Sequence, residues 1–148
     1  MSKPFSLQTL LDLSQLRLED ASRQLGKLMA SEQEASRRLE LLIQYRGEYH
    51  ARFLAAAKDG LSRAQWRNFE TFLGRLDVAI AQARHDDQAR KQHTAAGQKA
   101  WLAQRGRVDA FDTLAQRHQA REVQQEQKRE QKVQDEHAAR HWQEDTTG

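Results

Sequence analysis

The chain has 148 residues, of which 30% are charged and 38% hydrophobic, with a formal net charge of +3. It contains no Cys and a single Pro, at position 4, which excludes a disulfide scaffold and a Cys-based zinc site and favours long uninterrupted helices. No apolar run reaches the roughly 20 residues that a membrane span requires, and the N-terminus lacks the cleavage site of a signal peptide. We therefore expect an all-helical, cytoplasmic protein.

The first predicted helix covers residues 6–58, and we expect Ser6 to cap its start. From Leu11 to Ala56, steps of alternately three and four residues meet an apolar side chain or Tyr at eleven of fourteen positions. Such a row is the seam of a coiled coil, sustained here over about seven heptads. Three polar residues interrupt the row, and they are Ser14, Glu32 and Arg46.

The chain is predicted to turn at residues 59–61, where Gly60 has the position of a left-handed residue that ends a helix. Ser62 and Gln65 have the spacing of a capping box, which starts a second helix over residues 62–140. Two helices joined by so short a link run antiparallel. The numbers of facing residues then add to about 120, because the turn is centred on Gly60.

The second helix begins with a strong apolar seam that later becomes polar. The polar positions of this seam are Asp87, Arg90, Thr94 and Gly97. Arg90 faces Glu32 in this alignment, and the two side chains either pair across the seam or both extend into water. The apolar seam recovers at Trp101, but beyond about residue 115 the sequence is almost wholly polar. Because the first helix has run out there, we expect this tail to be unpaired and mobile.

These patterns predict an all-α fold. It is a single domain over residues 1–148, a long two-helix antiparallel coiled-coil hairpin whose second helix extends beyond the first. The main structural alternative is a homodimer that pairs through residues 11–56. The predicted seam residues are Leu11, Leu18, Leu25, Leu28, Leu39, Leu42, Tyr49, Phe53, Trp66, Phe69, Leu73, Ile80, Trp101, Val108 and Phe111.

The sequence gives little support to catalysis, cofactor binding or metal binding. Of six His residues, only His137 and His141 share a helix face, and no third metal ligand accompanies them. There is no Gly-rich phosphate loop and no Cys nucleophile, and a two-helix hairpin offers no closed pocket. Charges of both signs are interspersed along the chain, so we also expect no nucleic-acid binding.

A surplus of apolar side chains marks the start of the second helix. Phe72 and Ala79 flank the seam and align with Leu76 at i, i+4 and i+7. The apolar arc is therefore wider than two facing helices need, which suggests a protein-docking surface. The alternative is that Phe72 merely folds over the edge of the seam.

Several blocks of the sequence carry a family resemblance. They are an LxxLxDL opening (Leu7, Leu10, Asp12, Leu13), residues 19–26, an LxxLIxYxxEY block (Leu39, Leu42, Ile43, Tyr45, Glu48, Tyr49), the DGL turn at 59–61, a WxNFxxFLxxLxxAI block (Trp66, Asn68, Phe69, Phe72, Leu73, Leu76, Ala79, Ile80) and residues 101–117. Together they resemble the flagellar FliJ family, a soluble component of the bacterial flagellar type III protein export apparatus.

The resemblance implies a coiled coil similar to the central stalk of rotary ATPases. In the family, the helix termini insert into a hexameric export ATPase, which points to residues 1–20 and 105–148. The resemblance also implies that the region of Phe72, Leu76 and Ala79 contacts the cytoplasmic domain of the membrane export gate. The resemblance also implies recycling of export chaperones, a role in flagellum biogenesis, motility and chemotaxis, and a location at the cytoplasmic face of the inner membrane at the flagellar base. A coiled-coil homodimer scaffold or adaptor with no export role is the alternative.

Overall fold

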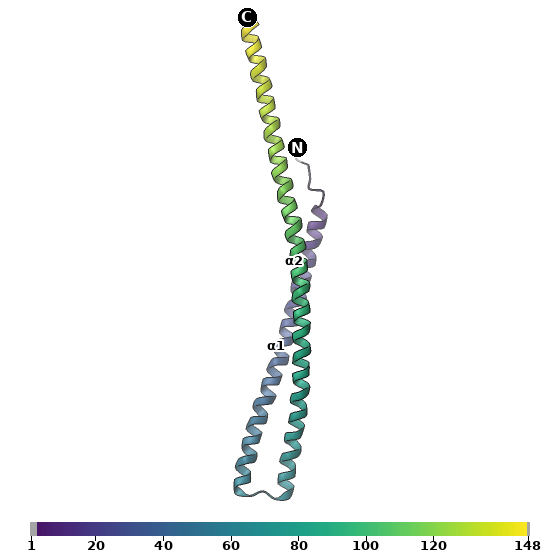
Figure 1. Cartoon of the computed structure of the whole chain (residues 1–148), viewed down its shortest axis with the longest axis vertical. Coiled ribbons are helices and arrows are strands. Elements are labelled where there is room, and N and C mark those ends of the chain that lie inside the picture. Colours follow the sequence, from purple (N-terminus) through teal and green to yellow (C-terminus); the bar gives the residue numbers. More distant parts are fainter. Residues whose placement is uncertain (1–2, 148) are drawn as a thin grey trace. The chain divides into compact units, whose positions relative to one another are not determined.

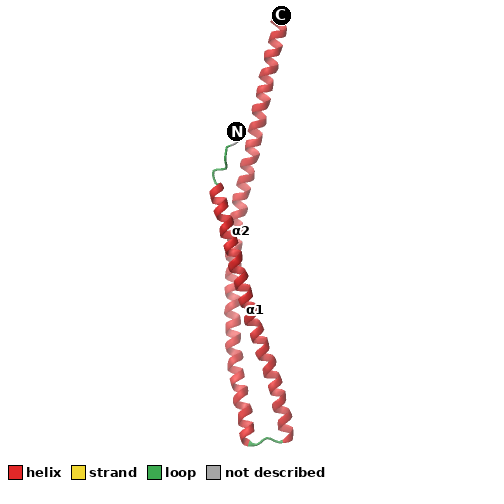
Figure 2. Cartoon of the chain, turned by 180° about the vertical axis from the view of Figure 1, so that it is seen from behind, coloured by secondary structure: helices red, strands yellow, loops and turns green. Residues whose placement is uncertain are grey.

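Two helices make up the computed structural model, which describes residues 3–147. Helix α1 spans Gln8–Asp59 and helix α2 spans Arg63–Thr147 (Figure 1). The described residues contain no strand (Figure 2), and the predicted all-α hairpin class is confirmed. Residues 1–19 with 103–148 form one compact unit, and residues 20–102 form a second. The predicted domain also included residues 1, 2 and 148, which lie outside the described residues.

The connection between the helices has the predicted chemistry. Gly60 has a φ of 92°, in the left-handed region that a residue without a Cβ adopts at low cost. Both hydrogen bonds of the capping box form at the start of α2. The backbone N–H of Gln65 donates to Ser62 Oγ at 3.2 Å, and the backbone N–H of Ser62 donates to Gln65 Oε1 at 3.0 Å. These contacts satisfy amide groups that the first turn of α2 would leave unpaired.

The predicted cap at Ser6 is wrong, because α1 begins two residues later than expected. The Gln8 amide donates to the Phe5 carbonyl at 3.1 Å, and the Leu11 amide donates to the Leu7 carbonyl at 2.9 Å. Ser6 therefore precedes the cap position, and in residues 3–147 its hydroxyl has no hydrogen-bond partner. At the other end of the chain, α2 continues past residue 140 to Thr147.

Within residues 20–102 the two helices lie antiparallel in one register. Side-chain hydrogen bonds across the helix interface join Ser36 to Asp87, Ser31 to Arg90 and Ser22 to Trp101. The residue numbers in these pairs add to 121–123, close to the predicted 120. The position of the turn therefore determines the register of the helices that it joins.

Side-chain size determines how closely α1 and α2 approach within this unit. Next to the turn, Phe53 packs against the rings of Trp66 and Phe69, with ring centroids 5.0 and 5.3 Å apart. The ribbons stand wider apart there than farther along the same unit (Figures 1 and 2). At Gly97 an added Cβ would lie 2.5 Å from Leu28 Cδ1, so Leu28 fills the notch that a glycine leaves.

The seam predicted on α1 agrees with the burial of its side chains. All fourteen positions from Leu11 to Ala56 are buried or half-buried. Among the predicted seam residues of α2, Trp66 is an exception at 45% exposure, although its ring still contacts Phe53. No described side chain is completely buried, as expected when only two helices cover one another. Because α2 occupies the seam of α1, that seam is not available for pairing between two chains.

In the other unit, the pairing extends farther along α2 than predicted. The ring centroids of Phe5 and His118 lie 5.6 Å apart, and the Lys3 amide donates to Glu122 Oε2 at 3.2 Å. The residues that precede α1 thus lie alongside α2, beyond the N-terminal end of α1. The unpaired tail therefore begins after Glu122 rather than at about residue 115, and side chains 123–146 are all exposed.

The burial pattern predicts which leucines stabilise the hairpin. Replacing Leu76, which is 7% exposed, with Ala should lower the free energy of unfolding by about 2–5 kcal/mol, because it removes packed methyl groups between the helices. The matched change Leu102→Ala, at 55% exposure on the same helix, should cost less than about 0.5 kcal/mol. Urea unfolding followed by circular dichroism measures both, and equal losses would contradict this packing.

Candidate functional site

The three predicted docking residues on α2 occupy two kinds of environment. Leu76 faces α1 and is buried, whereas Phe72 and Ala79 are half-buried at the edge of the helix interface. In this arrangement only Phe72 and Ala79 present atoms to an incoming partner. Leu76 lies beneath them and supports the surface that they form.

Phe72 joins the two helices on this side of the hairpin. Its ring centroid lies 4.4 Å from that of Tyr49 and 6.1 Å from that of Tyr45, the latter in an edge-to-face arrangement with an interplanar angle of 82°. The alternative interpretation, that Phe72 folds over the edge of the seam, thus holds for one part of the ring. Its remaining exposed surface is continuous with Tyr45, which is 44% exposed.

Two shallow grooves extend the apolar surface from α2 onto α1. One lies on α1 and is lined by Leu41, Leu42 and Tyr45 with charged neighbours. The other crosses between the helices and brings Leu42 beside Ala79, with polar and charged side chains around them. We call the resulting apolar surface the docking face, and its residues are Leu41, Leu42, Tyr45, Phe72 and Ala79. Sequence reasoning did not assign Leu41 or Tyr45 to this surface. The signal was available in the predicted register, which places the Tyr45–Tyr49 segment opposite Phe72.

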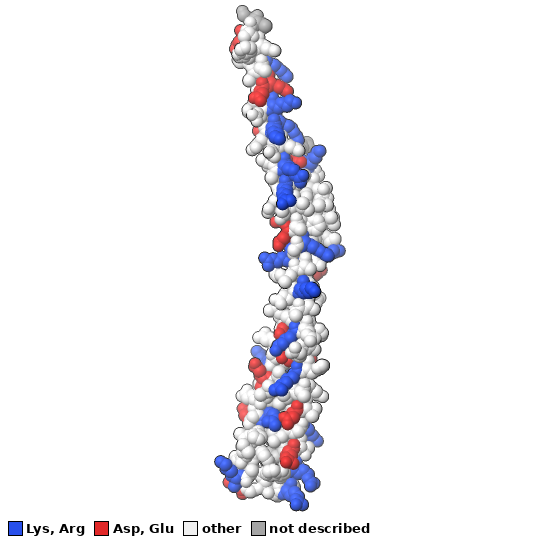
Figure 3. Space-filling model, viewed as in Figure 1, with Lys and Arg blue, Asp and Glu red and all other residues white. Residues whose placement is uncertain are grey.

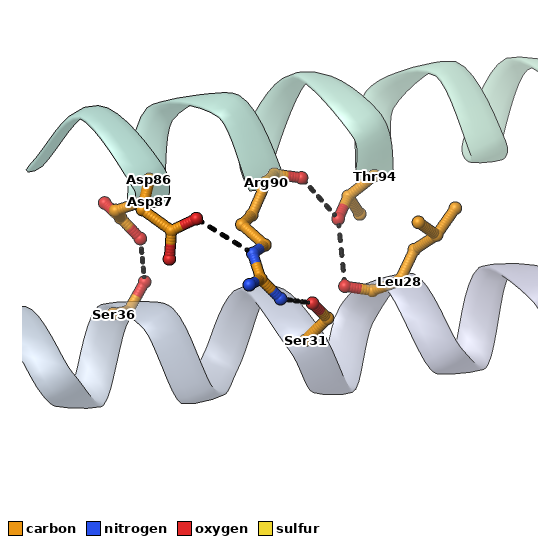
Figure 4. Close-up of polar contacts among 7 residues, drawn as sticks. All are labelled: Leu28, Ser31, Ser36, Asp86, Asp87, Arg90 and Thr94. Carbon is orange, nitrogen blue, oxygen red and sulfur yellow. Dashed lines mark hydrogen bonds and ion pairs between the residues drawn. The ribbon is translucent and has the colours of Figure 1, made fainter. Parts of the chain in front are cut away.

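A layer of polar contacts crosses the helix interface next to the docking face (Figure 4). Ser36 donates to the carboxylate of Asp87, which is 6% exposed, and Lys91 Nζ lies 3.1 Å from the second oxygen of that carboxylate. Arg90 donates to Ser31 and to Asp86. Thr94 donates to the carbonyl of Leu28 at 3.3 Å. We call this set the polar layer: Ser31, Ser36, Asp86, Asp87, Lys91, Arg90 and Thr94.

Pairing between Glu32 and Arg90, one of the two alternatives for these side chains, does not occur. Arg90 is used by Ser31 and Asp86, while Glu32 is half-buried and has no partner in the part of the chain that the structure describes. Arg46, the third polar residue in the α1 seam, forms an ion pair with Asp77 across the interface. Arg90 and Arg46 thus each contact a partner one position away from the residue that they face directly.

Two carboxyl groups have a lowered pKa because of these contacts. The hydrogen bond from Ser36, followed by that from Lys91, holds the pKa of Asp87 below its usual value. The hydrogen bond from Arg46 does the same for the pKa of Asp77. Buried polar groups that pair in only one alignment fix the register of a coiled coil, since any shift would leave them unsatisfied.

The described residues contain no arrangement suited to metal chemistry. No three His, Cys, Asp or Glu side chains in residues 3–147 gather closely enough to hold a metal ion. Within the same residues, neither helix has an apolar stretch able to span a bilayer.

Comparison with known proteins identifies the family. The family described as Flagellar FliJ protein matches residues 2–146 of the chain. The chain belongs to the FliJ family. A curated Flagellar FliJ protein of Salmonella typhi is 31% identical over 140 residues, which covers 95% of both chains. A Flagellar FliJ protein of Escherichia coli (strain K12) is also 31% identical, with the same coverage. The predicted resemblance is confirmed, and this FliJ-family chain is a flagellar protein.

The lowered pKa of Asp87 predicts how stability depends on acid. A carboxyl group whose pKa is lower in the folded state stabilises the fold above its ordinary pKa, about 3.9, and loses this contribution as the pH falls through the folded value. Asp87→Asn should therefore lower the free energy of unfolding at pH 7, whereas the difference between the variant and the unaltered chain should shrink as the pH falls below about 3.9.

Urea unfolding at pH 7, 5, 3 and 2.5 checks this dependence. Some acid sensitivity should remain in the variant, because Asp77 keeps its contact with Arg46. Asp135→Asn, at an exposed position of α2, is the matched control and should leave the pH profile unchanged. An offset between Asp87→Asn and the unaltered chain that is the same at all four pH values would contradict the role assigned to the carboxylate.

Proposed function

We propose that this FliJ-family chain is a non-enzymatic component of the flagellar protein export apparatus. In this proposal it acts as a stalk that couples the hexameric export ATPase to the cytoplasmic domain of the export gate. It also assists the recycling of export chaperones during flagellum assembly, at the cytoplasmic face of the inner membrane. Membership of the flagellar family supports the general role, and the docking face is the observation that carries the more specific one.

The docking face suits a protein partner. It joins exposed apolar atoms of Leu41 and Tyr45 on α1 to Phe72 and Ala79 on α2, and aromatic anchors of this kind carry much of the energy of protein interfaces. Its floor, which includes buried Leu76, is held by the packing between the helices. A partner would therefore meet a preorganised surface and lose little free energy in ordering it.

The two proposed contacts use different parts of the chain. All residues of the docking face belong to the unit formed by residues 20–102, whereas the region proposed for the ATPase, residues 1–20 and 105–148, lies almost wholly in the unit that contains residues 1–19 and 103–148. The two surfaces share no residue, so one chain can contact both partners at once. Substitutions should consequently separate gate binding from ATPase stimulation.

Ala79→Asp tests the gate contact. The change places a carboxylate in the groove beside Leu42, and binding to the purified cytoplasmic domain of the gate should weaken by about 1–3 kcal/mol because that charge would be buried by the partner. The matched control is Val78→Asp, because Val78 is 59% exposed and points to another side of α2. Calorimetry on both variants measures the difference.

Stimulation of the export ATPase should be the same in Ala79→Asp, Val78→Asp and the unaltered chain. Circular dichroism should show equal helix content, which separates loss of docking from loss of fold. The gate contact is wrong if Val78→Asp and Ala79→Asp bind the gate equally well. If both bind weakly and stimulate weakly, the substitutions have disturbed the hairpin instead.

The homodimer alternative makes an opposite prediction about concentration. Because α2 already covers the seam of α1, the chain should melt as a monomer, with a Tm that does not change over a hundredfold range of concentration. A Tm that rises with concentration, together with a dimeric mass in analytical ultracentrifugation, would favour the scaffold.

A further inference from the structure

The C-terminal part of α2 sorts its charges around the helix. Arg117, Arg121, Lys128 and Lys132 are separated by four, seven and four residues. At 100° per residue these four side chains fall within about 60° of one another, along roughly 22 Å of helix. We call them the basic stripe. Successive Lys and Arg side chains are visible along this part of the chain in Figure 3.

Most carboxylates of the C-terminal part of α2 occupy another side of the helix, and Asp135 is an exception that lies on the side of the basic stripe. Asp109, Asp112, Glu126 and Glu130 cluster about an angle roughly opposite to the basic stripe. The α2 residues that contact the N-terminal segment, such as His118 and Glu122, lie on a third side. The basic stripe therefore lies roughly at right angles to the side of α2 that contacts the segment preceding α1.

The charged groups of the basic stripe form no ion pair within the described residues, although Asp135 lines a shallow hollow with Lys128 and Lys132. All four side chains are exposed, and none of them takes part in an ion pair in residues 3–147. The polar contact of the stripe is internal, from Arg121 Nε to the carbonyl of Arg117 at 3.5 Å. Four aligned cations that form no ion pair, with one carboxylate near the last two, make a predominantly positive surface that is complementary to a row of carboxylates.

We infer that the basic stripe binds a carboxylate-rich protein surface. This inference rests on the proposed function, in which the unit containing the stripe contacts the export ATPase, and it identifies the acidic surface as part of that ATPase. Exposed pairs of this kind contribute little individually, but a row of them steers the partner and aligns it. The stripe would then determine how the helix is oriented around its axis within the ATPase.

The same segment is poorly suited to nucleic acid or to a lipid surface. The acidic side lies within the width of one helix, about 10–12 Å, which is close to the screening length at physiological salt, so a wrapping polyanion would meet both signs. Between Arg117 and Lys132 the stripe face carries Gln124 and Gln125 rather than apolar residues. Helices that lie on membranes need apolar side chains to insert beside their cations.

The test compares two variants with the same change in net charge. In the stripe variant, Arg117, Arg121, Lys128 and Lys132 are all replaced by Gln, a good helix former. In the matched control, four exposed cations near the turn, Arg52, Lys58, Arg63 and Arg67, are replaced by Gln. A third variant, Arg117→Lys with Arg121→Lys, keeps the charge of the stripe. Binding of each full chain to the purified ATPase is measured from 50 to 300 mM NaCl.

The stripe variant should bind on the order of tenfold more weakly at 50 mM NaCl and should lose most of its salt dependence. The control and the charge-keeping variant should bind like the unaltered chain. If the stripe variant binds as tightly as the unaltered chain, the inference is wrong while the proposed function stands. If the unaltered chain itself does not bind the ATPase, the proposed function fails and the inference with it.

Two further measurements use the unaltered chain and the stripe variant. Titration with duplex DNA and with vesicles containing anionic lipid should give no binding at physiological salt. A stripe-dependent affinity for either that exceeds the affinity for the ATPase would overturn the choice of a protein partner, as would stripe-dependent self-association of the chain.

Discussion

The antiparallel pairing of α1 and α2 within residues 20–102 is the interaction on which the candidate site depends. The docking face contains residues of both helices, and Tyr45 lies beside Phe72 because the register brings them together. A shift of one helical turn would separate these rings and move Leu42 away from Ala79. The turn with Gly60 in its left-handed conformation sets this register from one end, and the polar layer sets it again farther along the interface.

The hairpin obtains specificity from polar and small side chains because it has little core. No described side chain is completely buried, so apolar packing alone distinguishes weakly between neighbouring registers. In only one alignment does Asp87 accept a hydrogen bond from Ser36 while Leu28 packs into the space beside Gly97. Different residues thus set the spacing of the helices on the two sides of the docking face. Large rings widen the interface near the turn, and small or polar residues bring the helices closer together beyond it.

Most of the fold follows from the sequence, because a 3–4 spacing of apolar residues and a capping box are local signals. The seam of α1, the turn at Gly60 and the box at Ser62 are examples. The start of α1 was placed wrongly at Ser6 because a cap requires the right backbone geometry as well as the right side chain. The three α1 residues of the docking face were missed: Tyr45 and Leu41 lie outside the seam, and Leu42 was predicted only as a seam residue. Their contribution to this face appears only when both helices are aligned. The basic stripe was missed for another reason: charges counted along the chain look interspersed, although they separate when counted around the helix.

The central claim is that one chain folds onto itself in the register that places Tyr49 and Phe53 against the aromatic residues of α2. Isotope-filtered nuclear Overhauser spectroscopy on a mixture of labelled and unlabelled chains tests it directly. The ring centroids of Tyr49 and Phe72 lie 4.4 Å apart and those of Phe53 and Trp66 5.0 Å apart, so both ring pairs should give strong contacts within a single chain. Contacts seen only between labelled and unlabelled chains, or between rings shifted by a turn, would contradict the account.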